Sequence, residues 1–279
     1  MRFSRIYLEI TNVCNLACSF CPKTKRPPRT LTADEFSLLA AKLRPFSDDL
    51  YLHVMGEPLL HPQLAELLQI ADSLGFRVSL TTNGTLLGQA GGTLLSAPAL
   101  HRVSVSLHSF EANGQTDPES YIRTCAGFGR LAAERGILVS YRLWNVGGQD
   151  AQNSAITQTL AQTFPLPWTE NTRGFRLKDG VFLEYAEKFD WPDAEKPELR
   201  THGRCHALQQ QLAVLCDGTV VPCCLDHEGD LPLGNLFAQE LSEILDTART
   251  RAVRSGLCGK SPLAPLCRRC GYAARFLKK

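Results

Sequence analysis

Short apolar runs rich in β-forming residues alternate with helical patterns in the first half of the chain. The runs cover residues 6–10, 50–55, 76–81, 103–107 and 137–143. Stretches of helical periodicity separate most of them. This alternation predicts an α/β fold with a parallel sheet. An open doubly wound sheet and a (β/α) barrel both fit the periodicity, and both bind ligands at the carboxyl ends of the strands.

Three helices have readable ends. Thr32 and Glu35 have the spacing of a capping box, and the helix they begin should end near Pro45. A second helical pattern covers roughly residues 62–74 and stops at Gly75. A third covers roughly residues 120–135 and stops at Gly136. Each of these helices follows an apolar run, as a β/α repeat requires.

The composition describes a globular chain with little net charge. Its 279 residues are 44% hydrophobic, and 30 Lys and Arg stand against 28 Asp and Glu. A formal charge of +2 provides no strong field for nucleic acid or anionic lipid, so neither is an expected partner. The apolar runs are interrupted too early to cross a bilayer. The sequence therefore predicts a soluble, cytoplasmic protein.

Three of the 11 cysteines lie within eight residues, directly after the first apolar run: Cys14, Cys18 and Cys21. An odd number of unevenly spaced cysteines fits a disulfide framework poorly, so a metal site is the better interpretation. Three thiolates on one loop suit a 4Fe-4S cluster whose fourth iron stays open to a ligand that is not protein. Structural zinc is the alternative, but zinc sites usually pair two short ligand hooks, and no second hook lies nearby.

A second group of cysteines occupies the last third of the chain. Asp217-Gly218 predicts a hairpin that brings Cys205 and Cys223 together. A helical stretch is expected over roughly residues 238–253. After it, Cys267 and Cys270 form a short hook that completes a four-cysteine site for zinc or for an iron-sulfur cluster. Two more cysteines, Cys258 and Cys224, could replace one of the four. The remaining two, Cys125 and Cys216, are expected to be small core residues.

The N-terminal cysteine loop resembles the signature of the radical S-adenosylmethionine (SAM) superfamily. Three residues separate Cys14 from Cys18, two separate Cys18 from Cys21, and the aromatic Phe20 precedes the last cysteine. The resemblance implies a partial (β/α)6 TIM-like barrel. It also implies a 4Fe-4S cluster on the three cysteines, with SAM bound to the open iron.

Further positions resemble SAM-contacting residues of the family. Gly56, Glu57 and Pro58 match the last three residues of its Gly-Gly-Glu-Pro segment, with methionine in place of the first glycine. This match implies contacts with the methionine amino group. Ser106 resembles a serine that contacts the ribose or the carboxylate, and Arg142 resembles a carboxylate-binding arginine. The family's cofactor produces a 5'-deoxyadenosyl radical that abstracts hydrogen from an unactivated carbon.

The C-terminal cysteines, with the turn at Gly234-Asn235, resemble the twitch domain, a shortened relative of the SPASM domain. This resemblance implies one auxiliary 4Fe-4S cluster with four cysteine ligands. We expect a barrel domain over residues 1–200, in which residues 150–200 form a bridging and substrate region with a hairpin at Asp179-Gly180. A small α+β iron-sulfur domain is expected over residues 201–279. The four ligands implied are Cys205, Cys223, Cys267 and Cys270.

The leading functional hypothesis is a radical SAM oxidoreductase. A cluster saturated by four thiolates favours electron transfer, which suits dehydrogenation of a small molecule or modification of a peptide. A low-potential donor such as flavodoxin or ferredoxin would supply electrons. The alternative is an epimerase in which a cysteine returns hydrogen, with Cys258 and Cys224 as candidates. His108, close to Ser106, is a further catalytic candidate.

A hypothesis of another class is a non-enzymatic iron-sulfur electron carrier or a zinc-binding interaction protein, which would need no SAM-binding rim. Two features of the termini bear on the substrate. Little precedes the first apolar run, so no leader-binding domain is expected and a ribosomal peptide is less favoured. The chain ends in Leu277-Lys278-Lys279 rather than in the double glycine of the related GTP-cyclising enzyme, so that activity is not the expected one.

Overall fold

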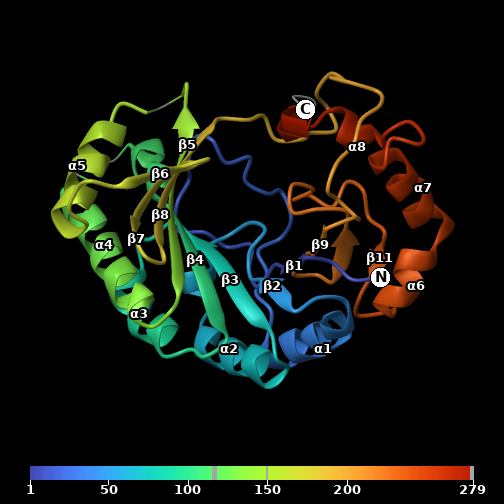
Figure 1. Cartoon of the computed structure of the whole chain (residues 1–279). Coiled ribbons are helices and arrows are strands. Elements are labelled where there is room, and N and C mark those ends of the chain that lie inside the picture. Colours follow the sequence, from blue (N-terminus) through green and yellow to red (C-terminus); the bar gives the residue numbers. More distant parts are fainter. Residues whose placement is uncertain (115–117, 149, 277–279) are drawn as a thin grey trace.

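Six parallel strands form the centre of the fold. The computed structural model describes residues 1–114, 118–148 and 150–276. In spatial order, the strands are β1 (Arg5–Leu8), β2 (Asp49–Tyr51), β3 (Arg77–Thr82), β4 (Leu100–Ser106), β5 (Leu138–Val146) and β8 (Val181–Glu187). The helices between them are α1 (Ala33–Leu43), α2 (Leu64–Ser73), α3 (Leu87–Leu95), α4 (Glu119–Ala133) and α5 (Asn153–Thr163). The five helices follow the outer side of the curved sheet, so the molecule is a partial (β/α)6 barrel (Figure 1).

Both edges of this sheet are extended by antiparallel strands. On one side β8 pairs with β7 (Gly174–Lys178), which pairs with β6 (Thr169–Asn171). On the other side β9 (Gln211–Val214) lies parallel to β1, followed by β10 (Thr219–Val221) and β11 (Gly234–Asn235). The C-terminal part therefore continues the sheet of the barrel. Its helices, α6 (Leu241–Asp246), α7 (Ala248–Leu257) and α8 (Pro265–Arg268), lie on the right in Figure 1.

Short 3-10 helices complete the connections. They cover Arg44–Phe46, Pro58–Leu60, Leu107–Ser109, Glu111–Asn113 and Gly271–Phe276. Within the described ranges, no helix has the length and apolar character that a bilayer crossing requires.

Alternation along the strands separates the apolar core from a polar interior. In β4, Val103 and Val105 are fully buried in the core, whereas Arg102 and Ser106 line a cavity inside the barrel. Arg142 and Trp144 of β5 line the same cavity. TIM-barrel interiors are usually filled by branched aliphatic side chains. The polar residues in this barrel instead leave room for a ligand.

Several local predictions are confirmed. Thr32 and Glu35 form the capping box, in which Glu35 N donates to Thr32 Oγ1 (3.2 Å) and Thr32 N donates to Glu35 Oε2 (2.9 Å). Helix α1 ends at Leu43, two residues before Pro45. Hairpins form at Asp179-Gly180 and Asp217-Gly218, and both glycines adopt positive φ.

Other predictions need correction. The run predicted as a strand over residues 50–55 is a strand only to Tyr51, because the chain then bends and the Met55 amide donates to Glu9 Oε1 (3.0 Å). The continuous helix expected over residues 238–253 is broken between α6 and α7. Thr247 ends the first helix and caps the second, accepting from Thr250 N at 3.1 Å. Helix α3, rich in glycine, was not predicted.

Candidate functional site

The N-terminal cysteine loop follows β1 and offers three thiols with hydrogen-bond donors beside them. Leu16 N donates to Cys14 Sγ (3.5 Å), and Lys23 N donates to Cys21 Sγ (3.4 Å). The side-chain amide of Asn113 donates to Cys18 Sγ at 3.0 Å. Donors to cysteine sulfur are among the features that tune iron-sulfur clusters. Burial raises the pKa of Cys18 to about 11, so metal binding would have to displace its proton.

Gly56 and Glu57 hold this loop against the ends of two strands. Gly56 has a φ of +75°, and a Cβ there would lie 2.4 Å from the Thr11 carbonyl oxygen. Glu57 N donates to the carbonyl of Val13 at 2.8 Å. The buried Glu57 carboxylate accepts from Thr82 Oγ1 and from Asn83 N, both at 2.7 Å. Pro58, next in the chain, is also buried. The segment thus ties the cysteine loop to the end of β3.

Replacing Gly56 by alanine should destabilise the protein by about 2 kcal/mol or more, because a side chain would have to occupy a left-handed conformation against backbone oxygens. Chemical denaturation of the anaerobically prepared protein measures this change. Gly92→Ala in α3 is the matched control, since nothing lies within 4 Å of the added Cβ. That variant should gain stability, by up to about 1 kcal/mol. Equal stability of the two variants would contradict the close approach.

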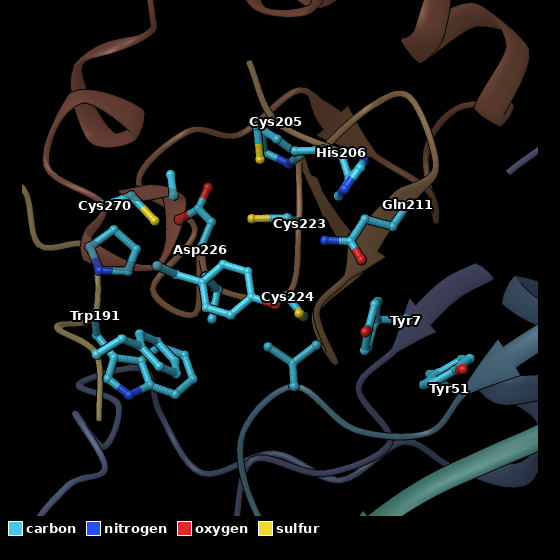
Figure 2. Close-up of a pocket in the computed structure, with 18 of the residues that line it drawn as sticks. Tyr7, Tyr51, Trp191, Cys205, His206, Gln211, Cys223, Cys224, Asp226 and Cys270 are labelled. Atoms are coloured by element: carbon cyan, nitrogen blue, oxygen red, sulfur yellow. The ribbon is translucent and has the colours of Figure 1, made fainter. Parts of the chain in front are cut away.

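A cavity of about 600 Å³ occupies the barrel interior and reaches the C-terminal cysteines. Phe20 of the N-terminal loop and His108 border it on one side. In Figure 2 the sulfur atoms of Cys205, Cys223 and Cys270 point toward a common space that also contains the Asp226 carboxylate. The cysteines that line the cavity are Cys205, Cys223, Cys224, Cys267 and Cys270.

The four cysteines implied as auxiliary ligands come from separate segments. Cys205 precedes β9, Cys223 follows β10, and Cys267 and Cys270 lie in and just after α8. Burial, with the neighbouring Cys205 and Cys270, raises the pKa of Cys267 to about 12. Burial also raises the pKa of Cys223 strongly, with Cys205 and Cys267 nearby. The predicted hairpin therefore brings Cys205 and Cys223 into one cluster with the C-terminal hook.

The spacing of these sulfurs bears on the choice between zinc and an iron-sulfur cluster. Among the residues that the structure describes, no three His, Cys, Asp or Glu side chains converge closely enough to hold a single metal ion. Zinc requires thiolates at about 2.3 Å from one centre. A cube of iron and sulfide holds its cysteines farther apart because each binds a different iron. Four cysteines are also the number of protein ligands that a 4Fe-4S cluster uses.

The cysteines considered for catalysis lie in different places. Cys224 lines the cavity and faces Tyr7 (Figure 2), and burial raises the pKa of its thiol to about 11. Cys258 instead follows α7, pairs with Arg204 in a β-bridge and lies outside the cavity lining. Cys125 and Cys216 are buried in the core. Of the spare cysteines, the structure brings Cys224 alone to the cavity.

His108, Ser106 and Arg142 all line the cavity. His108 is buried, its Nδ1 lies 3.0 Å from the Arg142 carbonyl, and burial lowers its pKa to about 4, so the ring is neutral at pH 7. Arg142 donates to Thr81 Oγ1 (3.2 Å), and its guanidinium carbon lies 4.5 Å from the centre of the Trp144 ring. Ser106 ends β4 at the same rim.

A buried ion pair that sequence reasoning missed links the two cysteine regions. The side chain of Glu9 is fully buried, and its carboxylate accepts from both terminal nitrogens of Arg26, at 2.7 and 2.8 Å. The same carboxylate accepts from the amides of Met55 (3.0 Å) and Cys216 (3.1 Å). Arg26 also donates to the carbonyl of His227 (2.8 Å). The one available signal was an acidic residue inside an apolar strand run.

The partial barrel, the cysteine loop and the C-terminal cysteine cluster together define an iron-sulfur enzyme of the α/β-barrel class. Residues 8–150 match the Radical SAM superfamily, and residues 205–271 match SPASM, an iron-sulfur cluster-binding domain. The chain belongs to the radical SAM superfamily. Membership implies a 4Fe-4S cluster and SAM, and the second match implies auxiliary iron-sulfur clusters.

Two similar proteins have different activities in their names. A GTP 3',8-cyclase from Chlorobaculum tepidum is 36% identical over 118 residues, which cover 39% of this chain and 36% of the cyclase. An AdoMet-dependent heme synthase from Methanosarcina barkeri is 33% identical over 128 residues, covering 43% of this chain and 36% of the synthase. The chain thus spans little more than a third of either relative.

Solved structures support the fold. SuiB from Streptococcus suis bound to S-adenosylmethionine has a TM-score of 0.64 and 16% identity, and the match covers 91% of this chain and 68% of SuiB. BtrN in complex with AdoMet and 2-DOIA has a TM-score of 0.56 and 19% identity, covering 97% of this chain and 94% of BtrN. The expected partial TIM-like barrel is confirmed.

Proposed function

We propose that this radical SAM enzyme is an oxidoreductase that dehydrogenates a small molecule or modifies a peptide. The observation that carries the proposal is one continuous cavity that borders both cysteine regions. Phe20 of the N-terminal loop lies on its lining, as do Cys205, Cys223, Cys267 and Cys270. A substrate in this cavity would lie between the two regions, close to the source of a radical and close to an electron acceptor.

The proposed roles of the residues rest on their resemblance to positions of the family. Cys14, Cys18 and Cys21 would hold the SAM-binding cluster. Gly56, Glu57 and Pro58 would face the methionine part of SAM, and their backbone is kept in place by the bonds of Glu57 to Thr82 and Asn83. Ser106 would contact the ribose or the carboxylate, and Arg142 the carboxylate. Together these groups would fix the orientation of the sulfonium.

The C-terminal cysteines would hold a single auxiliary cluster. With four thiolate ligands, Cys205, Cys223, Cys267 and Cys270, no coordination position is left for substrate, which favours electron transfer over Lewis-acid chemistry. When bound, SAM and the two clusters supply a 5'-deoxyadenosyl radical and an acceptor for one electron. Dehydrogenation then removes from the substrate one hydrogen atom, one proton and one electron. We assign this domain to residues 201–279 and the barrel with its bridging region to residues 1–200.

The proposed partners are a substrate and an electron donor. The names of the cyclase and the heme synthase support a small-molecule substrate. SuiB has also been solved bound to its precursor peptide SuiA, which supports a peptide. A low-potential protein such as flavodoxin or ferredoxin would deliver electrons.

Epimerisation is a second candidate because Cys224 faces the cavity beside Tyr7 (Figure 2). In this reaction the thiol of Cys224 would return a hydrogen atom to the substrate radical from the opposite face. His108 is a less suitable donor or base. Its Nδ1 is engaged by the Arg142 carbonyl, and its ring is packed 4.6 Å from that of Phe20.

Product mass after reaction in heavy water should distinguish the two candidates. The reconstituted enzyme would be incubated with dithionite, SAM and a metabolite extract, and products would be identified by mass spectrometry. Dehydrogenation should yield a product that has lost two hydrogens, and the Cys224→Ala variant should form the same product. Epimerisation should instead yield a product that keeps its hydrogen count and gains one deuteron from solvent. If this product forms with the wild type and is absent with Cys224→Ala, epimerisation is the reaction and the proposed oxidation is wrong. Cys258→Ala is the matched control because Cys258 lies outside the cavity lining.

A further inference from the structure

The cavity carries more positive than negative charge. Among the described residues that line it, six are Arg or Lys and two are Asp or Glu. Charged groups in a space shielded from water are unfavourable unless they are compensated. The lining cations are Arg5, Arg102, Arg142, Arg173, Lys188 and Arg200, and the lining acids are Glu184 and Asp226.

Four of these six cations are compensated, two of them by other groups of the protein and two by solvent. Arg200 lies within electrostatic reach of Cys205, Cys267 and Cys270, so it compensates the thiolates of that cluster. Arg102 donates to Ser140 Oγ (2.9 Å), which in turn donates to Glu184 Oε1 (3.4 Å). Arg173 and Lys188 are exposed to solvent.

Two cations of the cavity lining, Arg142 and Arg5, have no such compensation. Arg142 is the residue proposed above for the carboxylate of SAM, which leaves Arg5, at the start of β1, without an anionic counterpart. Its side chain hydrogen-bonds Tyr51 and lies within electrostatic reach of Tyr7 and Cys224, none of which is a carboxylate. Its guanidinium carbon lies 5.8 Å from the centre of the Tyr51 ring, and its Nε is buried without a hydrogen-bond partner.

A second unpartnered nitrogen borders the same aromatic ring. His53 also lines the cavity, and its ring centre lies 5.9 Å from that of Tyr51 and 5.3 Å from that of Tyr7. Figure 2 shows Tyr7 and Tyr51 side by side on this wall. His53 Nε2 lies 3.1 Å from Thr81 Oγ1, whereas Nδ1 is buried and has no partner.

The hydrogen bonds of Thr81 allow the tautomer of His53 in which Nε2 accepts. Thr81 Oγ1 accepts from Arg142 and can donate its own hydrogen to His53 Nε2. Removal from water and the charge of Arg142 lower the pKa of His53 to about 3, so the ring is neutral. A neutral ring that accepts at Nε2 carries its proton on Nδ1. Arg5 Nε and, in this tautomer, His53 Nδ1 are therefore two donors that lack acceptors on one wall of the cavity.

We propose that Arg5 and His53 form an oxyanion-binding site that holds a carboxylate or phosphate group of the substrate. This proposal assigns a substrate class to the enzyme proposed above, so it rests on the proposed function. The substrate is then an acid whose anionic group binds at the β1–β2 wall, which leaves the rest of the molecule to extend toward Phe20 and the N-terminal cysteine loop.

Isothermal titration of the anaerobically reconstituted holoenzyme, saturated with SAM so that Arg142 is engaged, tests the site. The probes are inorganic phosphate and malonate, each titrated at constant ionic strength set with sodium chloride. We expect saturable binding of at least one probe, and the tighter probe identifies the anionic group. Arg5→Gln should weaken this binding about ten-fold or more, because a charge-assisted donor is lost. Arg5→Lys should recover part of it.

The matched control is Arg123→Gln, which removes an exposed arginine on the outer side of α4 and should bind the probe as the wild type does. Thermal unfolding of each variant verifies that it is folded. The site is refuted if the wild type binds neither probe, or if a folded Arg5→Gln variant binds with unchanged affinity. Release of 5'-deoxyadenosine by the wild type without substrate is measured separately. A wild type that releases it but binds no probe overturns the oxyanion site alone, and one that binds probe but releases none overturns the proposed function alone.

Discussion

Replacing Cys14 by alanine should abolish the release of 5'-deoxyadenosine and lower the iron content from about eight to about four atoms per chain. Cys14 lies on the loop after β1, and its neighbours Cys18 and Cys21 provide two further thiols with donors beside them. Loss of one of three ligands leaves a second iron without a protein ligand, and the cluster is then lost. The auxiliary cysteines are untouched, because they belong to separate segments of the C-terminal part.

Anaerobic reconstitution followed by iron analysis and chromatography of the nucleoside products measures both effects. Cys125→Ala is the matched control, since Cys125 is a fully buried core cysteine against Tyr121 and Gly84. It should retain about eight irons and the same yield of 5'-deoxyadenosine. Zinc in place of iron, or undiminished product from Cys14→Ala, would contradict the assignment of the loop. If the wild type retains its iron but releases no 5'-deoxyadenosine when SAM is added, the result would instead favour a non-enzymatic electron carrier.

Replacing Glu9 by glutamine should destabilise the protein by about 3–5 kcal/mol, because one partner of a buried ion pair is then left with an uncompensated charge. Glu9 is fully buried and Arg26 is 11% exposed, so water cannot substitute for the missing charge. The glutamine amide can replace only part of the acceptor set that Arg26, Met55 and Cys216 use. Because Arg26 lies just after the cysteine loop and Cys216 just after β9, the loss should also loosen the junction between the two parts of the chain.

Denaturant unfolding of the reconstituted protein under anaerobic conditions measures the change. Asp246→Asn is the control, since it removes the acidic partner of an exposed pair with Arg251. The median contribution of such surface pairs is about 0–1 kcal/mol, so this variant should unfold close to the wild type. If Glu9→Gln were no less stable than Asp246→Asn, the buried pair would have no part in holding the two regions together.

Features coded within a few residues of each other could be predicted. The capping box at Thr32 and Glu35 and the glycine turns at Gly180 and Gly218 depend on local backbone geometry, which neighbouring residues determine. The spacing of Cys14, Cys18 and Cys21 is equally local. The alternation of apolar runs with helical patterns predicted the β/α fold, and the cysteine loop pointed to the family to which the chain belongs.

Features that depend on contacts between distant segments could not be predicted. Cys224 and Cys258 were equivalent candidates by sequence, yet Cys224 lines the cavity and Cys258 is not part of its lining. The place of Arg5 in the cavity could not be predicted, since an arginine at the start of a strand is most often a surface residue.

By itself the sequence determined the β/α alternation of the first half, the cysteine spacing that marks the family and the presence of a second cysteine group. Only the tertiary structure decided which side chains share the cavity, because inward and outward positions alternate along each strand and strand pairing brings together residues far apart in the chain. The pairing of β1 with β2 places Arg5 and His53 on one wall, and the pairing of β1 with β9 brings Cys216 to Glu9, to which Arg26 also bonds.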